Sequence, residues 1–215
     1  ISPDVDKLPI LNRMFLSNDP FVNERGQVES IMIGSRGCTY HCAFCGAAQG
    51  RGTSEAVRHR KSSRIIEEML LLESLFNVQH FRFVDDLFLS NMSFIENWCQ
   101  ELGSLPFRDN IGWDATGRIN ILGQLSDLQL SRIATFGCKE LAIGIESGSD
   151  RVLGYMGKSL CRSQVVRTVS SLLRNGINVK GYFILGYPTE TRAELTETID
   201  LINCLWDLSD KFNGS

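Results

Sequence analysis

The chain has 215 residues, of which 43% are hydrophobic and 22% are charged, and its formal net charge is −3. This composition is typical of a globular domain, and the slight negative charge argues against a protein that holds nucleic acid by bulk positive charge. No apolar stretch reaches the roughly 20 residues that a membrane-spanning helix needs, and no signal peptide is visible. We therefore expect a cytoplasmic protein with no membrane partner and no evident nucleic-acid partner. Because the chain begins with Ile1 rather than Met, we also expect it to be part of a longer protein.

Residues 1–29 mix polar turn residues with a few apolar positions and are predicted to be a linker or N-terminal extension. From residue 30 onward, short apolar runs alternate with segments of helical apolar spacing. The predicted strands lie at 30–34, 80–84, 110–118, 139–147 and 178–188. The predicted helices lie at about 63–76, 93–103, 126–137, 163–176 and 191–208, and capping boxes mark three of their starts, at Ser93/Glu96, Ser126/Gln129 and Thr191/Glu194. The basic run from Arg58 to Lys61 is predicted to be a solvated loop.

Strands that alternate with helices of this length predict βαβ units and a parallel sheet. The expected fold class is therefore α/β, a partial (β/α) barrel of about five βα units within residues 30–215. Right-handed crossovers place the carboxyl ends of all strands at one edge of the sheet. The notable polar residues follow these ends, where barrels of this kind carry out their chemistry.

Three of the seven cysteines, Cys38, Cys42 and Cys45, follow the first predicted strand with the spacing C-x3-C-x2-C. In a chain without export signals, such a cluster indicates a reduced compartment and a metal site rather than a disulfide framework. Thiolates bind zinc or iron–sulfur clusters. Zinc would need a fourth ligand, for which His41 is awkwardly placed, whereas a cubane cluster on three cysteines keeps one iron open to a ligand. The spacing alone leaves both possibilities open.

The loop Cys38-x3-Cys42-x-Phe44-Cys45 resembles the signature of the radical S-adenosylmethionine (SAM) enzymes. Three further stretches agree with that family in order and position: "FVDDLF" after the second strand, "GIESGSDRVLGYMGK" at the fourth and "GYFILGYPTET" at the fifth. Together they are most similar to the branch that includes cobalamin-dependent enzymes and methylthiotransferases. The resemblance covers residues 30–208 and implies a partial barrel of the radical SAM type.

The resemblance implies a [4Fe-4S] cluster on the three cysteines, with SAM bound at the open iron. It also implies that Asp85 or Asp86 faces the SAM ammonium group, that Glu146 binds the ribose hydroxyls and that the backbone at Gly186 approaches the adenine. Arg118 could pair with the SAM carboxylate, because a planar guanidinium suits a carboxylate. For each of these residues the alternative is an ordinary structural role, such as helix capping or a surface ion pair.

We therefore expect the core of an enzyme that reductively cleaves SAM to a 5′-deoxyadenosyl radical, which takes a hydrogen atom from a substrate. The stretch "DVDKLPILNRMF" resembles the linker after a cobalamin-binding domain. It points to a cobalamin-dependent methyltransferase or rearrangement enzyme, with cobalamin held by a domain outside this chain. The alternatives are a radical SAM enzyme without cobalamin, either methylthiotransferase-like or dehydrogenating, and a non-catalytic iron–sulfur or zinc protein.

The enzyme interpretation implies a reducing partner such as flavodoxin or ferredoxin and a small-molecule or peptide substrate. Because the family core usually has six βα units, we expect the C-terminal part of the core to be incomplete in this chain.

Overall fold

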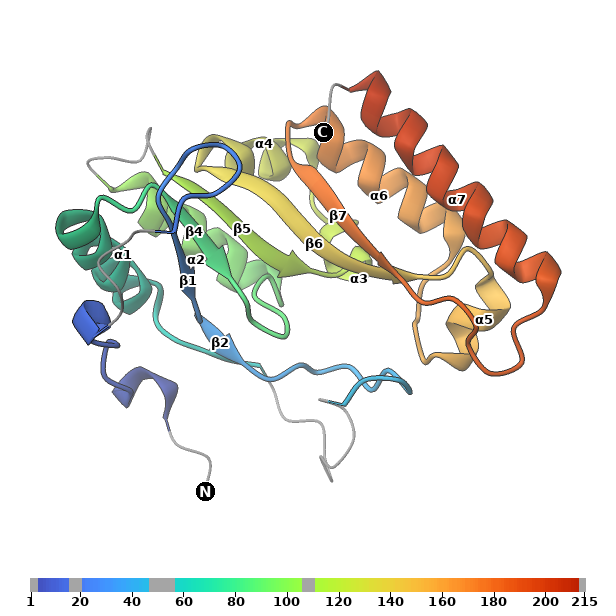
Figure 1. The fold of residues 1–215 in the computed structure, drawn as a ribbon, viewed down its shortest axis with the longest axis horizontal. Coiled ribbons are helices and arrows are strands. Elements are labelled where there is room, and N and C mark those ends of the chain that lie inside the picture. Colours follow the sequence, from blue (N-terminus) through green and yellow to red (C-terminus); the bar gives the residue numbers. More distant parts are fainter. Residues whose placement is uncertain (1–3, 16–20, 47–56, 106–110, 213–215) are drawn as a thin grey trace.

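A computed structural model of the chain describes residues 4–15, 21–46, 57–105 and 111–212. A sheet of five parallel strands lies at the centre of the protein (Figure 1). In spatial order, which is also chain order, the strands are β1 (Glu29–Met32), β4 (His80–Phe83), β5 (Gly112–Gly117), β6 (Cys138–Glu146) and β7 (Asn178–Phe183). Every neighbouring pair is parallel, so all five carboxyl ends lie at one edge of the sheet. This confirms the predicted α/β class.

Five helices alternate with these strands, as the apolar spacing predicts. They are α1 (Ser62–Phe76), α2 (Met92–Gly103), α4 (Asp127–Thr135), α6 (Arg162–Arg174) and α7 (Arg192–Lys211). Their apolar faces pack on one face of the sheet and bury its aromatic side chains. Phe83 and Phe88 stack there with ring centroids 4.2 Å apart. Trp98 and Trp113 meet these two rings and each other edge to face, with centroids 5.4–6.4 Å apart. These contacts join α2 to β4 and β5.

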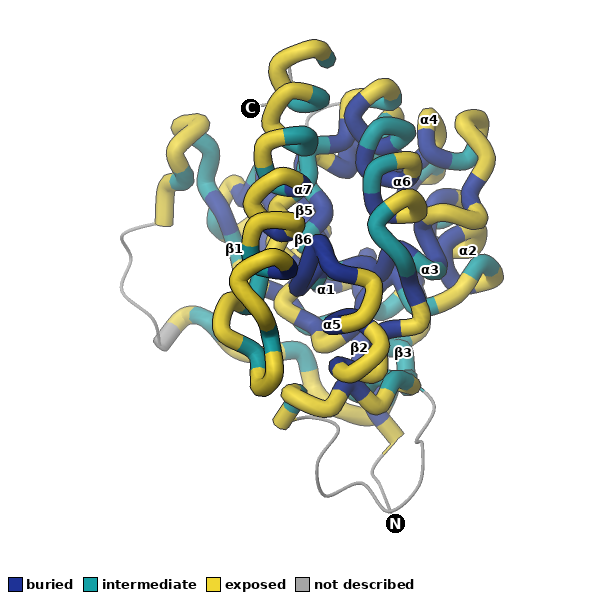
Figure 2. Tube along the Cα trace, turned by 90° about the vertical axis from the view of Figure 1, so that its right-hand side faces the viewer, coloured by how far each residue is buried: buried dark blue, intermediate teal, exposed yellow. Residues whose placement is uncertain are grey.

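The opposite face of the sheet is much more exposed. Ile31 of β1 is 57% exposed and Tyr182 of β7 is 50% exposed, although both lie within strands. In Figure 2 the tube is dark blue where β5 and β6 run beneath the helices and yellow along the outer side of α7. The helices therefore cover one face of the sheet, whereas the other face combines exposed residues with the buried side chains of Glu29, His80 and Asp114.

Local capping signals explain most of the helix starts. The capping boxes predicted at Ser126/Gln129 and Thr191/Glu194 are confirmed at the N-termini of α4 and α7. The box predicted at Ser93 is wrong, because Asn91 caps α2 and its side chain accepts a hydrogen bond from the Phe94 N–H at 2.9 Å. Ser93 consequently lies inside the first helical turn.

After residue 30 the structure adds short elements to the predicted ones: the helices α3 (Ile119–Leu122) and α5 (Asp150–Tyr155), and the antiparallel pair β2 (Ser35–Arg36) and β3 (Arg58–His59). Each is too short to show a periodic pattern.

The solvated loop predicted for Arg58–Lys61 is wrong at two positions. Arg58 pairs with Arg36 in the β2–β3 ladder, and the Arg60 guanidinium forms a 2.7 Å ion pair with the carboxylate of Glu68. The Glu68 side chain is only 4% exposed and that of Arg60 is 12% exposed, so this arginine pairs with a buried carboxylate of α1 instead of lying in solvent.

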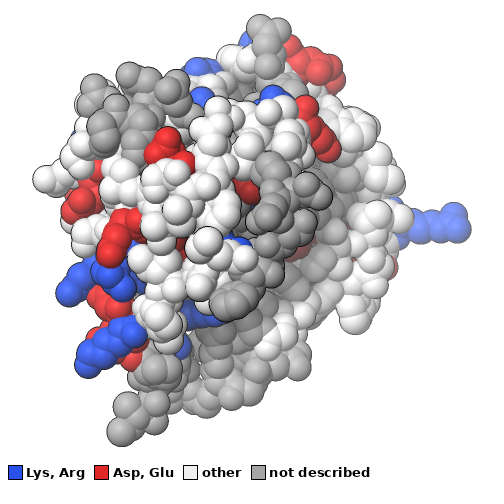
Figure 3. Space-filling view, turned by 60° about the vertical axis from the view of Figure 1, so that its left-hand side comes forward, with Lys and Arg blue, Asp and Glu red and all other residues white. Residues whose placement is uncertain are grey.

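The N-terminal residues pack on the sheet and on α1. Two short 3₁₀ helices, η1 (Val5–Lys7) and η2 (Arg13–Phe15), precede β1, and Arg13 pairs with Glu68 at 2.8 Å. On the surface in Figure 3, Lys and Arg side chains lie beside Asp and Glu side chains. None of the helices in the described part of the chain combines the length and the hydropathy that a membrane span requires.

Candidate functional site at the carboxyl edge of the sheet

The residues singled out in the sequence follow the carboxyl ends of the strands. The three cysteines come after β1 and the two-residue β2 that follows it, the two aspartates after β4, Arg118 after β5 and Gly186 after β7, while Glu146 is the last residue of β6. Because the strands are parallel, these positions share one edge of the sheet. The fold therefore brings the predicted site residues to the same side of the protein.

The three loop cysteines are not joined in disulfide bonds. Cys42 is buried at 6% exposure, whereas Cys38 and Cys45 are partly exposed. The loop is attached to α5 by a hydrogen bond from the Ala43 N–H to the Met156 carbonyl at 2.9 Å. In the described ranges, no three His, Cys, Asp or Glu side chains are arranged to hold a metal ion. Three thiols on one loop nevertheless form a donor set that suits an iron–sulfur cluster.

The side chain of Arg118 reaches this loop. Its Nη1 donates to the Cys42 sulfur at 3.3 Å, and its guanidinium carbon lies 3.5 Å from the centroid of the Tyr40 ring. Arg118 is 8% exposed, and its Nε and Nη2 have no hydrogen-bond partner among the described residues. These two nitrogens form one edge of the guanidinium plane, the edge that binds a carboxylate with two parallel hydrogen bonds. Buried donors without partners are costly, so this edge suits an anionic ligand.

The two aspartates after β4 differ in their surroundings. Asp85 is buried, and its carboxylate accepts hydrogen bonds from the Gly34 N–H at 3.0 Å and from the Ser35 hydroxyl. Burial raises the pKa of the Asp85 carboxyl, and the hydrogen bonds from Ser35 and Gly34 oppose this rise. Asp86 is exposed. Asp85 thus fixes the backbone at the start of the cysteine loop, and the predicted contact of either aspartate with an ammonium group stays a prediction.

Glu146 ends β6 in an unusual backbone conformation, with φ at +72°. Its carboxylate forms a 2.9 Å ion pair with Lys158, and the two side chains are only 8% and 4% exposed. The Lys158 ammonium also donates to the Gly144 carbonyl at 2.7 Å. A Cβ atom on Gly144 would lie 2.2 Å from Oε1 of Glu146, so the glycine leaves the space that the ion pair occupies. A left-handed non-glycine residue at a strand end is a frequent feature of ligand sites.

Lys158 is the site residue that sequence reasoning missed. It is the last residue of the stretch "GIESGSDRVLGYMGK". Lysine side chains are usually solvent-exposed, so the sequence does not indicate that this one is buried. Its ammonium lies 5.9 Å from the centroid of the Phe44 ring in the cysteine loop. Lys158 therefore connects β6 to this loop.

Gly186 lies in the exposed turn after β7. Its φ is +76°, which favours glycine, and its N–H donates to the Glu190 carboxylate at 2.6 Å. The other carboxylate oxygen of Glu190 is buried without a hydrogen-bond partner in the described part of the chain. The expected approach of the Gly186 backbone to adenine remains a prediction.

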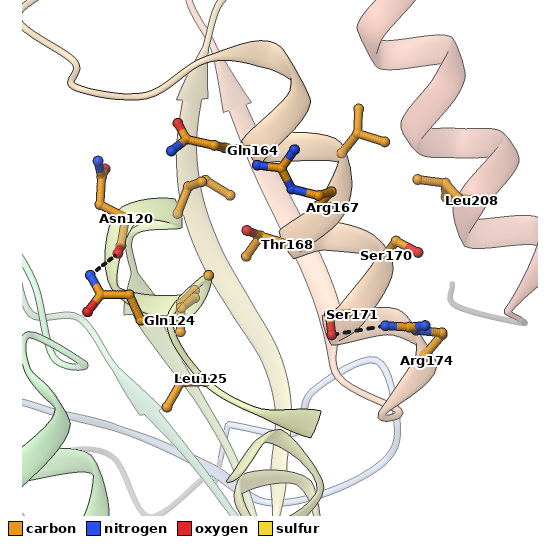
Figure 4. A pocket seen from close by; sticks show the side chains of 14 residues that line it. Asn120, Gln124, Leu125, Gln164, Arg167, Thr168, Ser170, Ser171, Arg174 and Leu208 are labelled. Carbon is orange, nitrogen blue, oxygen red and sulfur yellow. Dashed lines mark hydrogen bonds between the residues drawn. The ribbon is translucent and has the colours of Figure 1, made fainter. Parts of the chain in front are cut away.

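A separate hollow of about 740 Å³ lies between α3, α6 and α7 (Figure 4). Figure 4 shows Asn120 and Gln124 on one side and Arg167, Thr168 and Ser171 of α6 on the other. The cysteines, Arg118 and Glu146 do not line it. The hollow is therefore distinct from the edge that gathers the predicted site residues.

Comparisons with known families and proteins give several matches to this chain. The model of a family described as the Radical SAM superfamily matches residues 32–202. The chain is 29% identical to an uncharacterized methyltransferase of Pyrococcus horikoshii, over 91% of this chain and 41% of the relative. It is 28% identical to bacteriochlorophyllide d C-12(1)-methyltransferase of Chlorobaculum tepidum, over 87% and 40% of the two chains.

A relative with a different printed activity also matches. The chain is 27% identical to tRNA-2-methylthio-N(6)-dimethylallyladenosine synthase of Pelobacter propionicus, over 87% of this chain and 44% of that protein. The chain therefore spans about two fifths of the length of these curated relatives.

Solved structures share the fold. The radical SAM methyltransferase TsrM from Kitasatospora setae, solved with cobalamin and a [4Fe-4S] cluster, aligns with a TM-score of 0.71 at 16% identity, over 84% of this chain and 33% of that one. The cobalamin-dependent radical enzyme OxsB, solved with aqua-cobalamin and SAM, aligns with a TM-score of 0.69 at 21% identity, over 85% and 29% of the two chains. At these identities the likeness concerns the fold alone.

Proposed function

The chain belongs to the radical SAM superfamily, and from this premise we propose that it is the catalytic core of an enzyme that reductively cleaves SAM, within a cobalamin-dependent methyltransferase. When bound, a [4Fe-4S] cluster supplies the electron that breaks a C–S bond of SAM and yields the 5′-deoxyadenosyl radical. The observation that carries the proposal is the contact between Arg118 and Cys42. A buried cation with an unused carboxylate-binding edge lies directly beside the thiol of Cys42, which we propose as a cluster ligand.

The other residues at this edge have roles consistent with the proposal. Asp85 holds the start of the cysteine loop against the end of β4 through Gly34 and Ser35. Glu146 presents a carboxylate, fixed by Lys158, that can accept hydrogen bonds from the ribose hydroxyls. Asp86 is exposed beside Asp85 and is the better placed of the two to meet the SAM ammonium or the substrate. We further propose a reduced, cytoplasmic setting with a flavodoxin or ferredoxin as the reductant.

The proposed use of cobalamin is supported by the comparisons with known proteins and not by the residues of this site. Relatives carry the name methyltransferase, and two solved proteins with this fold contain cobalamin. A methylthiotransferase-like enzyme without cobalamin is the second candidate, favoured by the Pelobacter propionicus relative. Membership of an enzyme superfamily speaks against the non-catalytic alternative. The substrate, whether a small molecule or a peptide, would be selected largely by parts of the protein outside this chain.

Anaerobic reconstitution of the full-length protein tests the core of the proposal. We expect about four irons per chain, as a cubane requires, and 5′-deoxyadenosine from SAM in the presence of dithionite. Replacing Cys38, Cys42 or Cys45 by Ala should abolish both. Cys204→Ala is the matched control, because Cys204 is a partly buried cysteine of α7. This variant should keep both the iron content and the formation of 5′-deoxyadenosine. A Cys42→Ala variant that keeps four irons and its activity would exclude the assignment.

The visible absorption spectrum after incubation with a cobalamin distinguishes the two candidate functions. Bound cobalamin in the full-length protein supports the methyltransferase. If the protein forms 5′-deoxyadenosine but binds no cobalamin, the methylthiotransferase-like alternative takes its place.

A further inference from the structure

We propose that Arg118 couples SAM binding to the reduction potential of the cluster, because one guanidinium joins a cluster thiol to the position of the SAM carboxylate. The inference deepens the proposed function and rests on it. One end of the guanidinium, Nη1, donates to the Cys42 sulfur at 3.3 Å. The opposite edge, Nε and Nη2, is buried and has no partner among the described residues. The guanidinium of Arg118 therefore contacts the Cys42 sulfur at one end and offers its other edge to the SAM carboxylate.

The surroundings make the contact with sulfur effective. Cys42 is buried, whereas Cys38 and Cys45 are partly exposed. Arg118 therefore donates its hydrogen bond to the least solvent-exposed of the three thiols. The Tyr40 ring lies 3.5 Å beneath the guanidinium carbon and fixes the plane of the group. In a poorly solvated setting, a cation beside sulfur has a larger electrostatic effect than it would in water.

The direction of the effect follows from charge. Reduction adds one negative charge to the cluster, and a hydrogen bond or a cation at a ligating sulfur stabilises that charge. Arg118 should therefore raise the reduction potential while SAM is absent. A carboxylate bound to the other edge would partly neutralise the guanidinium and weaken this effect. Binding of SAM would in this way change the electrostatic effect of Arg118 on the Cys42 sulfur, and with it the reduction potential of the cluster.

Redox measurements on the reconstituted full-length protein test this coupling. The midpoint potential is determined by electron paramagnetic resonance at a series of poised potentials, with and without SAM, for Arg118→Met, Arg118→Lys and the wild type. Arg174→Met serves as the control, because Arg174 is an exposed arginine of α6 that pairs with Asp127. Iron content is measured for every variant.

We expect Arg118→Met to have a more negative midpoint than the wild type without SAM, and the difference between them to narrow when SAM is added. Arg118→Lys keeps the charge but not the planar fork, and should fall between the two. The control should match the wild type. An unchanged midpoint in both Arg118 variants, or a difference that SAM does not alter, would overturn the inference.

The outcomes also separate this inference from the proposed function. If Arg118→Met holds no iron, Arg118→Lys decides the test, and loss of iron from both variants would make Arg118 a structural residue and overturn the coupling. If the wild type itself holds no cluster, the proposed function fails. A wild-type cluster with unaltered potentials in the variants defeats the coupling alone.

Discussion

Replacing Lys158 by Met should destabilise the protein strongly, because it leaves the Glu146 carboxylate buried without its partner. The two side chains are 4% and 8% exposed and lie 2.9 Å apart, so the pair belongs to the buried class rather than to the surface class. Surface pairs contribute about 0–1 kcal/mol, whereas removing one partner of a buried pair costs about 3–5 kcal/mol. The variant also deprives the Gly144 carbonyl of its hydrogen bond from the ammonium. We therefore expect a loss near 3–5 kcal/mol.

Urea unfolding followed by circular dichroism measures this loss. With a denaturant slope of about 2–3 kcal/mol/M, the midpoint should fall by about 1–2.5 M urea. Lys180→Met is the matched control, because Lys180 is an exposed lysine of β7, and it should change stability by less than about 0.5 kcal/mol.

A double variant checks the physical reason. Lys158→Met combined with Glu146→Gln removes the uncompensated charge and leaves only neutral polar groups buried, at a cost of about 1–3 kcal/mol. The double variant should therefore be more stable than Lys158→Met alone. The reasoning is refuted if Lys158→Met is no less stable than Lys180→Met, or if the added Glu146→Gln restores nothing.

Two further predictions concern carboxylates near the same edge. Glu146→Gln should weaken SAM binding by about 1.5–3 kcal/mol, roughly 10- to 150-fold, because hydrogen bonds to a charged group are lost. Calorimetric titration with SAM measures the affinity, with the iron content of the variant checked to equal that of the wild type. An unaltered affinity would contradict a contact between Glu146 and the ribose. The Arg151 guanidinium, with Thr191, holds the pKa of Glu194 well below its usual range, so its stabilisation is complete above the unfolded-state pKa of about 4.3 and is lost as the pH falls further. The difference in thermal stability between wild type and Glu194→Gln should therefore be larger at pH 7 than at pH 3, and an equal difference at both values would contradict this account.

The order of strands and helices could be predicted because each long element carries its own periodic pattern. The N-terminus of α7 illustrates this, since Thr191 and Glu194 are three residues apart and form a capping box within the first turn of the helix. Where two capping residues compete, local pattern is insufficient. Asn91 and Ser93 are both suitable N-cap residues for α2. The sequence pattern predicts Ser93, whereas Asn91 is the N-cap in the structure.

The candidate site could be located from the sequence, but its internal contacts could not. The positions of the cysteines, Arg118 and Glu146 at one edge follow from the parallel topology. The donation from Arg118 to Cys42 joins residues 76 positions apart, and no periodicity encodes such a contact. Lys158 was missed for a related reason, because its burial depends on the space left by Gly144 in a neighbouring strand.

The two strands β2 and β3 have a consequence for how the cysteine loop can vary. They pair Ser35 with His59 and Arg36 with Arg58, so both ends of the segment 37–57 are tied together at its base. Asp85 anchors one end through Ser35, and His59 stacks on Phe94 at the other, with ring centroids 3.8 Å apart. For a segment whose ends are already joined, doubling the length costs only about 0.6 kcal/mol of closure entropy. A change in the length of this segment should accordingly have little effect on the sheet, provided that its base and the packed residues Cys42 and Ala43 are preserved.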